Sequence, residues 1–342
     1  METVWFCLVA VMIALYVVLD GFDLGAGAVH LLVARTNDER RLVLRSIGPV
    51  WDGNEVWLVA GGGTLYCAFP ALYASSFSGF YLPLMMVLWL LILRAISIEF
   101  RNHIDSPVWQ PLWDFVFSAA SALLAVFFGA ALGNVVRGVP LDAEGGFFVP
   151  LWTDFTTGRN PGVLDWYTVT VGLTALVTLT VHGALWVALK TEGGVERRAR
   201  ALARRLWWGL LALTVLVTLF SFAIQPQLQR SFGARPWGCV FPLAALAGLL
   251  GMRVMQGMRQ FLCSALFILA MLTSAAFGIY PYVLPASTDP RFGLTIHNAA
   301  AASYGLKVGL AWFIPGMLLV AGYFVYVYRS FAGKVRLEED GY

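Results

Sequence analysis

Acidic residues stand inside two apolar stretches of this sequence, and they are the residues best suited to chemistry. Asp20 and Asp23 belong to the string LDGFDLG in the first apolar run, and Asp52 and Glu55 belong to WDGNEVW at the start of the second. An acid at bilayer depth costs about 3 kcal/mol on insertion scales, so it seldom faces lipid and usually serves a function. A functional role is therefore the default hypothesis for Asp20, Asp23 and Asp52, and a proton or ion pathway is the first candidate.

The first pair lies in a segment that must pack against protein. Asp20 and Asp23 are three residues apart and share one helix face, while Gly21 and Gly25 form a neighbouring stripe where another backbone can approach closely. Two interpretations stay open. The acids either conduct protons or ions, or they are neutral carboxyls hydrogen-bonded between helices, because burial penalises the ionised form.

The second pair also has a local interpretation. Glu55 follows Asp52 by three residues, which is the spacing of a capping box, and Asn54 is a second candidate for the cap. A capping role and a relay role for Asp52 are both open.

A cation occurs near the inner end of the third apolar run. Arg94 precedes Glu99 by five residues, so the two could neutralise one another or a neighbouring charge. We favour the simpler interpretation that both side chains reach toward the membrane interface while their aliphatic stems stay in the apolar layer.

Composition indicates an all-α polytopic membrane protein. The 342 residues are 59% hydrophobic and 13% charged, with a mean hydropathy of +0.73, whereas soluble domains have about 45–50% and about 25%. Runs of about 20 apolar residues predict nine transmembrane helices, and a weak repetition is compatible with two bundles, helices 1 to 4 and 5 to 8, and a peripheral ninth helix, although no shared motif supports it. We expect residues 1–342 to form a single integral membrane domain. The predicted spans are Thr3–Val33, Asn54–Tyr73, Phe77–Ser97, Leu112–Arg137, Gly162–Leu189, Leu206–Ile224, Gly238–Met252, Phe261–Tyr280 and Ser303–Tyr328.

The distribution of cations predicts the orientation. Most of the 23 Lys and Arg residues fall in the loops after helices 1, 3, 5 and 7 and at the carboxyl end, which indicates an external, periplasmic amino terminus and a cytoplasmic carboxyl terminus. Asp20 and Asp23 then lie in the inner half of helix 1, and Asp52 lies at the cytoplasmic mouth of helix 2. Because the cations sit in short separate loops, we expect no nucleic-acid partner.

Cysteine and histidine patterns give no metal site. The four cysteines lie singly, and none of the four histidines has a partner four residues away. His182, with small neighbours, is the best candidate for a haem ligand, but we favour a packed or hydrogen-bonded role; His103 and His297 lie near loops. Two hypotheses follow from the residues: a proton-conducting subunit of a redox complex with its cofactors elsewhere, or a secondary transporter coupled to protons through Asp20 and Asp23.

Strings spread over most of the chain resemble one family. They are DGFDLG at 20–25, DERR at 38–41, WDGNEVW at 51–57, FSGFY at 77–81, GN at 133–134 with GVP at 138–140, and YPYVLP at 280–285. In this order they resemble subunit II of the cytochrome bd-type ubiquinol oxidases, including the cyanide-insensitive branch. His297 departs from the family, since a larger aromatic residue is expected there.

The resemblance implies a fold of two four-helix bundles plus one peripheral helix, in a non-haem subunit of the bacterial cytoplasmic membrane. It would pair with a haem-bearing subunit I, which carries haems b558, b595 and d and oxidises quinol while reducing dioxygen. Family subunits II can hold a structural quinone, and some complexes include a small accessory subunit. By this resemblance Asp20, Asp23 and Asp52 belong to the proton-delivery route or its supporting network, with Asn54, Glu55 and Trp57 as nearby supporting residues. A purely scaffolding chain is the second hypothesis and the transporter the third.

Overall fold

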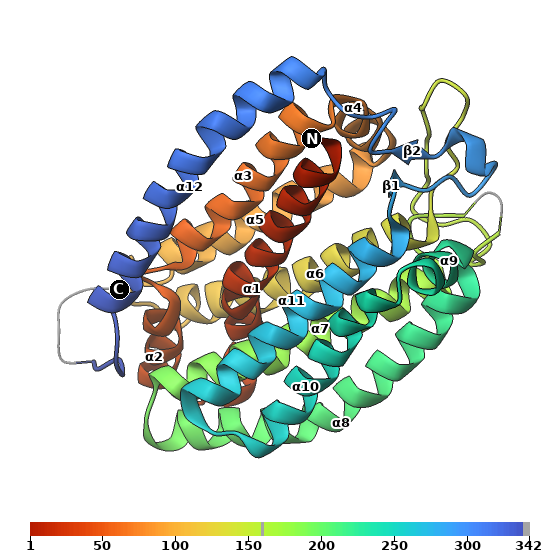
Figure 1. The fold of residues 1–342 in the computed structure, drawn as a ribbon. Helices are drawn as coiled ribbons and strands as arrows, with labels where there is room; N and C mark the ends of the chain where they lie inside the picture. The colour runs from red at the N-terminus through yellow and green to blue at the C-terminus, as the bar shows by residue number, and fades with distance from the viewer. Residues whose placement is uncertain (159–160, 338–342) are drawn as a thin grey trace.

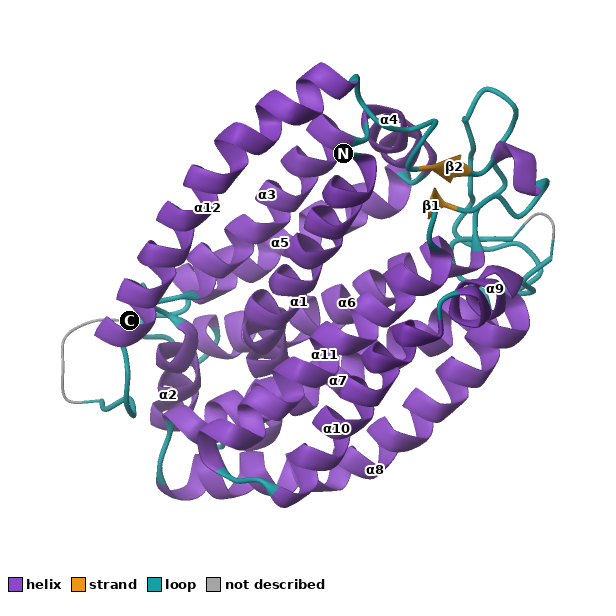
Figure 2. Cartoon of the chain, viewed as in Figure 1, coloured by secondary structure: helices purple, strands orange, loops and turns teal. Residues whose placement is uncertain are grey.

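The computed structural model describes residues 1–158 and 161–337. The chain is built almost wholly of α-helices, most of which run roughly along one direction (Figure 1), and only two very short strands interrupt them (Figure 2). The helices are α1 Glu2–Val33, α2 Asn37–Ile47, α3 Trp51–Ala68, α4 Pro70–Gly79, α5 Tyr81–Phe100, α6 Trp109–Arg137, α7 Trp166–Lys190, α8 Gly193–Ile224, α9 Pro226–Ala234, α10 Val240–Val254, α11 Gly257–Ile279 and α12 Ser303–Ser330.

Eight helices of the described chain are long and apolar enough to span a membrane: α1, α5, α6, α7, α8, α10 with the turn before it, α11 and α12. The second predicted span, Asn54–Tyr73, differs. It begins at Trp51, earlier than expected, and ends at Ala68, because Pro70 starts a separate helix after a break at Phe69. The predicted fold class, an all-α polytopic membrane protein, is confirmed.

The helices form the two predicted groups. The first contains α1, α3, α5 and α6, and the second contains α7, α8, α10 and α11, with α1 and α6 both packed along α7. Helix α12, which corresponds to the ninth predicted span, is peripheral, as predicted. It runs along the outside of the first group (Figure 1), and only Leu306 of its residues is buried.

The two groups meet closely at small residues. A Cβ atom added to Gly25 of α1 would collide with backbone atoms of Leu179 and Gly183 in α7, and one added to Gly183 would collide with the backbone of Gly25. Only glycine permits such a short distance between α1 and α7. Close packing at small residues is what holds helices together in lipid, where no hydrophobic driving force acts between them. The glycine stripe therefore sets the position of Asp20 and Asp23 relative to the second group.

Two helix starts and one loop differ from the sequence prediction. Helix α8 begins at Gly193, well before the predicted Leu206, because its basic first turns still bury one apolar face, Val195, Ala199 and Ala203. Helix α7 begins at Trp166, where Asp165 caps it. The segment between α11 and α12 contains a short hairpin that the sequence did not predict. Its elements are β1 Tyr282–Leu284, η2 Pro290–Phe292 and β2 Leu294–Thr295; a further 3₁₀ turn, η1 Pro236–Cys239, precedes α10.

Candidate functional site

A buried ion pair joins α1 to α5. Arg94 Nη1 donates to Oδ2 of Asp20 (2.8 Å), and Arg94 Nη2 donates to Oδ1 (2.5 Å). Both side chains are fully buried. A bidentate pair of this kind is strong and geometrically specific, so Asp20 is held in one orientation and its charge is compensated.

This pair corrects the prediction for Arg94. Its partner is Asp20 and not Glu99, and it does not reach to the interface, because no part of its side chain is exposed. Glu99 is half-buried at the end of α5, and its backbone carbonyl accepts a hydrogen bond from His103 (2.9 Å). A guanidinium at this depth needs a carboxylate within reach, and α1 supplies it.

Asp23 has a different kind of partner. The Asn54 amide nitrogen donates to Oδ2 of Asp23 (2.7 Å), and the hydroxyl of Tyr328 donates to the amide oxygen of Asn54 (2.9 Å). Asn54 thus links α1 to α12. Asp23 is fully buried and, among the described residues, forms no ion pair with a cation at salt-bridge distance.

Asp52 and Glu55 lie between this group and the surface. Helix α3 begins at Trp51 with no side-chain cap, so Asp52 lies inside the first turn and the predicted capping box is wrong. Asp52 is exposed. The Glu55 side chain is 23% exposed, and its Oε2 lies 4.0 Å from Nη2 of Arg94. The two acids therefore lead from the surface toward the buried pair.

Several polar atoms at this site are left unsatisfied. Oδ1 of Asp23, Nε of Arg94, the Tyr16 hydroxyl and the Trp57 indole nitrogen are buried without a hydrogen-bond partner among residues 1–158 and 161–337. Unpaired buried polar atoms are rare in native proteins, and internal water is the usual partner. We call Asp20, Asp23, Asn54 and Arg94 the acid site; its free polar atoms are suited to holding water.

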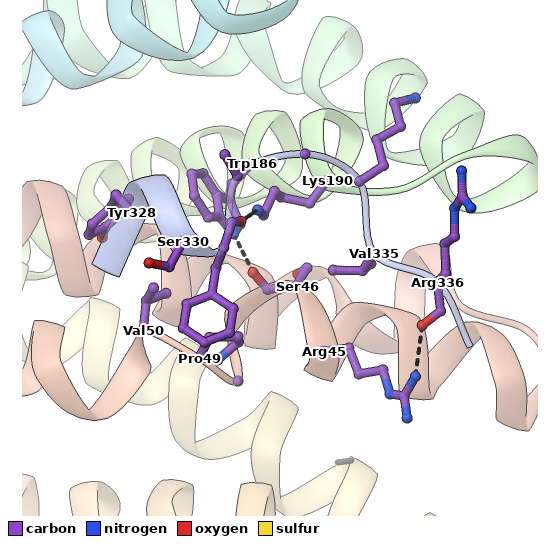
Figure 3. Close-up of a pocket in the computed structure, with 15 residues that line it drawn as sticks. Arg45, Ser46, Pro49, Val50, Trp186, Lys190, Tyr328, Ser330, Val335 and Arg336 are labelled. Atoms are coloured by element: carbon purple, nitrogen blue, oxygen red, sulfur yellow. Dashed lines mark hydrogen bonds between the residues drawn. The ribbon is translucent and has the colours of Figure 1, made fainter. Parts of the chain in front are cut away.

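A cavity borders the acid site. It has a volume of about 420 Å³ and lies where α2, α7 and α12 end (Figure 3). Tyr328 lines this cavity and also binds Asn54. A short chain of side chains, Tyr328 and Asn54, therefore connects the cavity wall to Asp23.

Asp114 forms a second buried charged group that the sequence analysis missed. Its carboxylate accepts hydrogen bonds from Nε2 of His30 (2.6 Å), Nε of Arg101 (2.5 Å) and Nη1 of Arg40 (3.0 Å). These residues come from α1, α2 and α6 and from the turn after α5. No short-range spacing brings them together, so only the tertiary structure shows the group.

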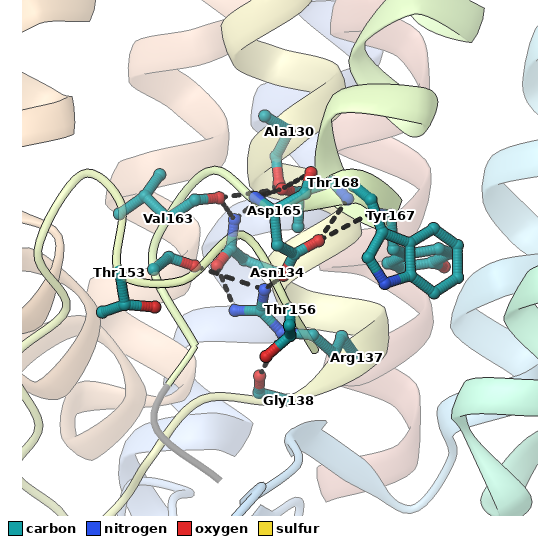
Figure 4. Close-up of polar contacts among 12 residues, drawn as sticks. Ala130, Asn134, Arg137, Gly138, Thr153, Thr156, Val163, Asp165, Tyr167 and Thr168 are labelled. Atoms are coloured by element: carbon teal, nitrogen blue, oxygen red, sulfur yellow. Dashed lines mark hydrogen bonds and ion pairs between the residues drawn. The ribbon is translucent and has the colours of Figure 1, made fainter. Parts of the chain in front are cut away.

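A third group, the Asp165 cluster, consists of Asn134, Arg137, Asp165 and Thr168 (Figure 4). Arg137 donates to the Asp165 carboxylate and also to Oδ1 of Asn134 (2.6 Å). Asp165 accepts from the backbone N–H groups of Tyr167 and Thr168 (2.8 Å each) as the N-cap of α7. The cluster fastens the end of α6 to the start of α7.

The histidines singled out in the sequence have protein partners. His182 Nε2 donates to the carbonyl of Val18 (3.0 Å), its Nδ1 lies 2.7 Å from Oγ of Ser264, and its ring stacks on Phe261. The hydrogen-bonded role is confirmed, and with both nitrogens engaged the ring does not fit a haem ligand. His297 pairs with Glu2 at the surface (2.6 Å). In the described part of the chain, no three His, Cys, Asp or Glu residues are grouped as metal ligands.

Comparison with known proteins identifies the family. Residues 1–331 match the family described as cytochrome bd terminal oxidase subunit II. The chain belongs to this family. A probable cytochrome oxidase subunit 2 of Haemophilus influenzae is 30% identical, with 97% of this chain and 94% of the relative covered. Cytochrome bd ubiquinol oxidase subunit 2 of Bacillus subtilis is 28% identical, with 99% and 98% covered, and cytochrome bd-I ubiquinol oxidase subunit 2 of Escherichia coli is 28% identical, with 98% and 95% covered.

A solved structure shows the same fold as this subunit II chain. The bd oxidase structure from Geobacillus thermodenitrificans contains a chain with a TM-score of 0.71 and 19% identity, covering 96% of this chain and 98% of that one. At this identity the likeness concerns the fold alone.

Within this member of the subunit II family, sequence analysis found part of the site. The strings around Asp20 and Asp52 led to the acids and to Asn54. Tyr328 was missed, because a tyrosine near the end of an apolar helix is typical of an interface and carries no sign of a buried partner. Arg94 was found, but its partner was not.

Proposed function

We propose that this chain is the non-haem subunit II of a bd-type quinol oxidase, a quinol:dioxygen oxidoreductase complex of the bacterial cytoplasmic membrane. It packs against a haem-bearing subunit I, which carries haems b558, b595 and d, and it contributes to proton delivery from the cytoplasm. The family membership supports the complex, and the names of the Bacillus subtilis and Escherichia coli relatives support quinol as the reductant. The amino terminus is periplasmic and the carboxyl terminus cytoplasmic in this proposal, which treats residues 1–342 as one integral membrane domain.

One observation carries the proton role. Asp23 is fully buried, one of its oxygens accepts from Asn54, and the other has no partner among the described residues. A group that passes protons must be able to bind and release them, with a hydrogen-bonded or water-bridged neighbour on each side. Asp23 meets the first requirement better than Asp20, whose ionised form is held by Arg94.

Each acid has a different role in this proposal. Asp52 is exposed and receives protons at the surface, and Glu55 lies one turn deeper, near Arg94. Asp23 passes the proton on through water that its free oxygen binds. Asp20 and Arg94 position the group and set its local charge, while Trp57 closes its outer side. We assign no residues to a structural quinone or to an accessory subunit.

Substitution of single carboxylates tests the proposal. Asp23→Asn and Asp52→Asn, each expressed with subunit I, should assemble with normal haem content but lower quinol-driven oxygen uptake per haem by at least about tenfold for Asp23, equivalent to about 1.4 kcal/mol. Asp38→Asn, an exposed acid of α2 at the same end, is the matched control. Unchanged uptake in both variants, with normal haem, would remove the proton role.

A scaffolding role is the second candidate, because the fully paired Asp20 and Arg94 lock α1 against α5. It predicts that substitution of any of the three acids lowers haem retention and not the rate per haem. The visible spectrum of the gently purified complex separates both candidates from the proton-coupled transporter, since bands of haems b and d are expected only for an oxidase.

A further inference from the structure

The cavity beside Tyr328 has an unusual charge. Four of its lining residues are cationic, namely Arg45, Lys190, Lys334 and Arg336, and no acidic residue lines it within the described chain. The walls come from the end of α2 and the turn after it, the last turn of α7, the end of α12 and the segment that follows α12 (Figure 3).

Lys190 contributes a charge that the wall does not neutralise. Its half-buried ammonium donates to the carbonyl of Phe331 (2.6 Å) and lies 5.4 Å from the centre of the Trp186 ring. It forms no ion pair with a carboxylate of residues 1–158 or 161–337. Lys334, by contrast, pairs with Glu196 outside the cavity (3.2 Å). A partly desolvated cation of this kind attracts an anion.

The other walls indicate what kind of anion fits. Trp186, Tyr328 and Phe331 supply apolar surface next to the cations. The cavity lies at the level where α7 and α12 end, which is where lipid headgroups meet a membrane protein. Its volume of about 420 Å³ is within the range of about 300–1,000 Å³ typical of small-molecule sites.

We propose that this cavity binds the phosphate group of an anionic phospholipid. Lys190 contacts the phosphate in this proposal, and the aromatic wall contacts the glycerol and the first methylenes of the acyl chains. Basic pockets between transmembrane helices on the cytoplasmic side bind headgroups in this way.

Retention of lipid by the assembled complex tests the site. The complex with subunit I is purified as wild type, Lys190→Gln, Lys190→Arg and Arg259→Gln, a control cation of α11 that does not line the cavity. Each is incubated with vesicles of phosphatidylcholine and phosphatidylglycerol, and bound phosphatidylglycerol is counted by native mass spectrometry. Lys190→Gln should retain about fivefold less at subsaturating lipid, the factor that one cation contributes near an anionic surface, whereas the other two variants should match the wild type.

Control measurements separate loss of the lipid site from failure of the variant to fold. Haem content and assembly yield identify any variant that fails to fold, and Lys190→Arg restores the charge. Equal retention in Lys190→Gln and wild type overturns the proposal. A second result also overturns it: inorganic phosphate alone stabilises the complex in a way that depends on Lys190, while no lipid is retained. The bound anion would then be a soluble phosphate and not a lipid headgroup. The result does not depend on turnover and is therefore independent of the proton role proposed for Asp23.

The chain also carries a competing anion in its own sequence. Glu338, Glu339 and Asp340 follow the cavity-lining segment. Retention of lipid only by a chain ending at residue 337 would show that these carboxylates fill the cavity in the full chain, and would contradict the lipid assignment.

Discussion

The acid site and the Asp165 cluster have the same ingredients but differ in how completely they are paired. Each contains a buried carboxylate, a guanidinium and an asparagine. In the Asp165 cluster every side-chain polar atom has a partner among the described residues, whereas Asp23 and Arg94 each keep a buried atom without one. Such an atom costs about 1–3 kcal/mol if it stays dry. The difference indicates that one group fixes the fold and the other serves a function.

The largest effect should come from removing the guanidinium of the acid site. Arg94→Gln leaves the Asp20 carboxylate buried without its cation, and breaking such a pair costs about 3–5 kcal/mol. We expect loss of most assembled complex, measured as haem content per membrane protein. The double variant Asp20→Asn with Arg94→Gln should recover part of it, because neither charge is then left alone. No recovery would show that the pair has a role beyond charge compensation.

A comparable loss of stability is expected at the Asp165 cluster, without a loss of rate. Asp165→Ala removes the partner of Arg137 and the cap of α7, and capping alone is worth about 1 kcal/mol. The thermal midpoint of the complex should fall clearly, while oxygen uptake per haem stays at the wild-type value. A lower rate per haem would erase the distinction between the two groups.

A smaller effect is expected where the acid site meets the cavity. Tyr328→Phe removes the hydrogen bond to Asn54 and keeps the ring, which costs about 1 kcal/mol. Asn54 then holds Asp23 less firmly, so oxygen uptake should fall about twofold to fivefold with normal haem content. Tyr326→Phe, an exposed tyrosine on the same helix, is the control. Equal rates in the two variants would exclude a role for Tyr328 in the site.

The smallest effect concerns a charged group outside the spans. Partial burial acts to raise the pKa of Glu39, but hydrogen bonds from the Arg35 backbone and from Arg198 outweigh it, so the pKa lies below its ordinary value. The stabilisation is therefore present above the unfolded pKa of about 4.3 and is lost as the pH falls through the folded pKa.

Glu39→Gln should accordingly lower the thermal midpoint slightly at pH 7, and the gap from wild type should close on acidification below about pH 4. Glu144→Gln, at an exposed loop position, should show no such gap. A difference between Glu39→Gln and wild type that is constant with pH would mean that charge at Glu39 contributes nothing, leaving only its capping contact with Thr36.

The sequence predicted the location of the helices well, because the length of an apolar run determines it. It predicted the helix ends poorly, because tertiary packing competes there with capping and proline signals. Runs of about 20 apolar residues can only be spanning helices in lipid, so most spans were located correctly. The break at Phe69 and the early start of α8 were missed because a proline within an apolar run and a basic amphipathic turn are both compatible with several boundaries. The capping box at Asp52 failed because α3 begins two residues earlier than the motif requires, with Val50 and not Asp52 at the N-cap position.

The sequence by itself determined that this chain is an all-α membrane protein with acids at depth, because these properties depend on composition and local spacing. Only the tertiary structure decided which charges are paired. Arg94 pairs with Asp20 of another helix, Asp114 accepts from two arginines and a histidine of separate elements, and Tyr328 reaches Asn54 from the far end of the chain. Helix packing brings together partners that are so distant in sequence. The close contact of α1 and α7 at Gly25 and Gly183 is part of that packing, and no periodicity along the chain predicts which residues it pairs.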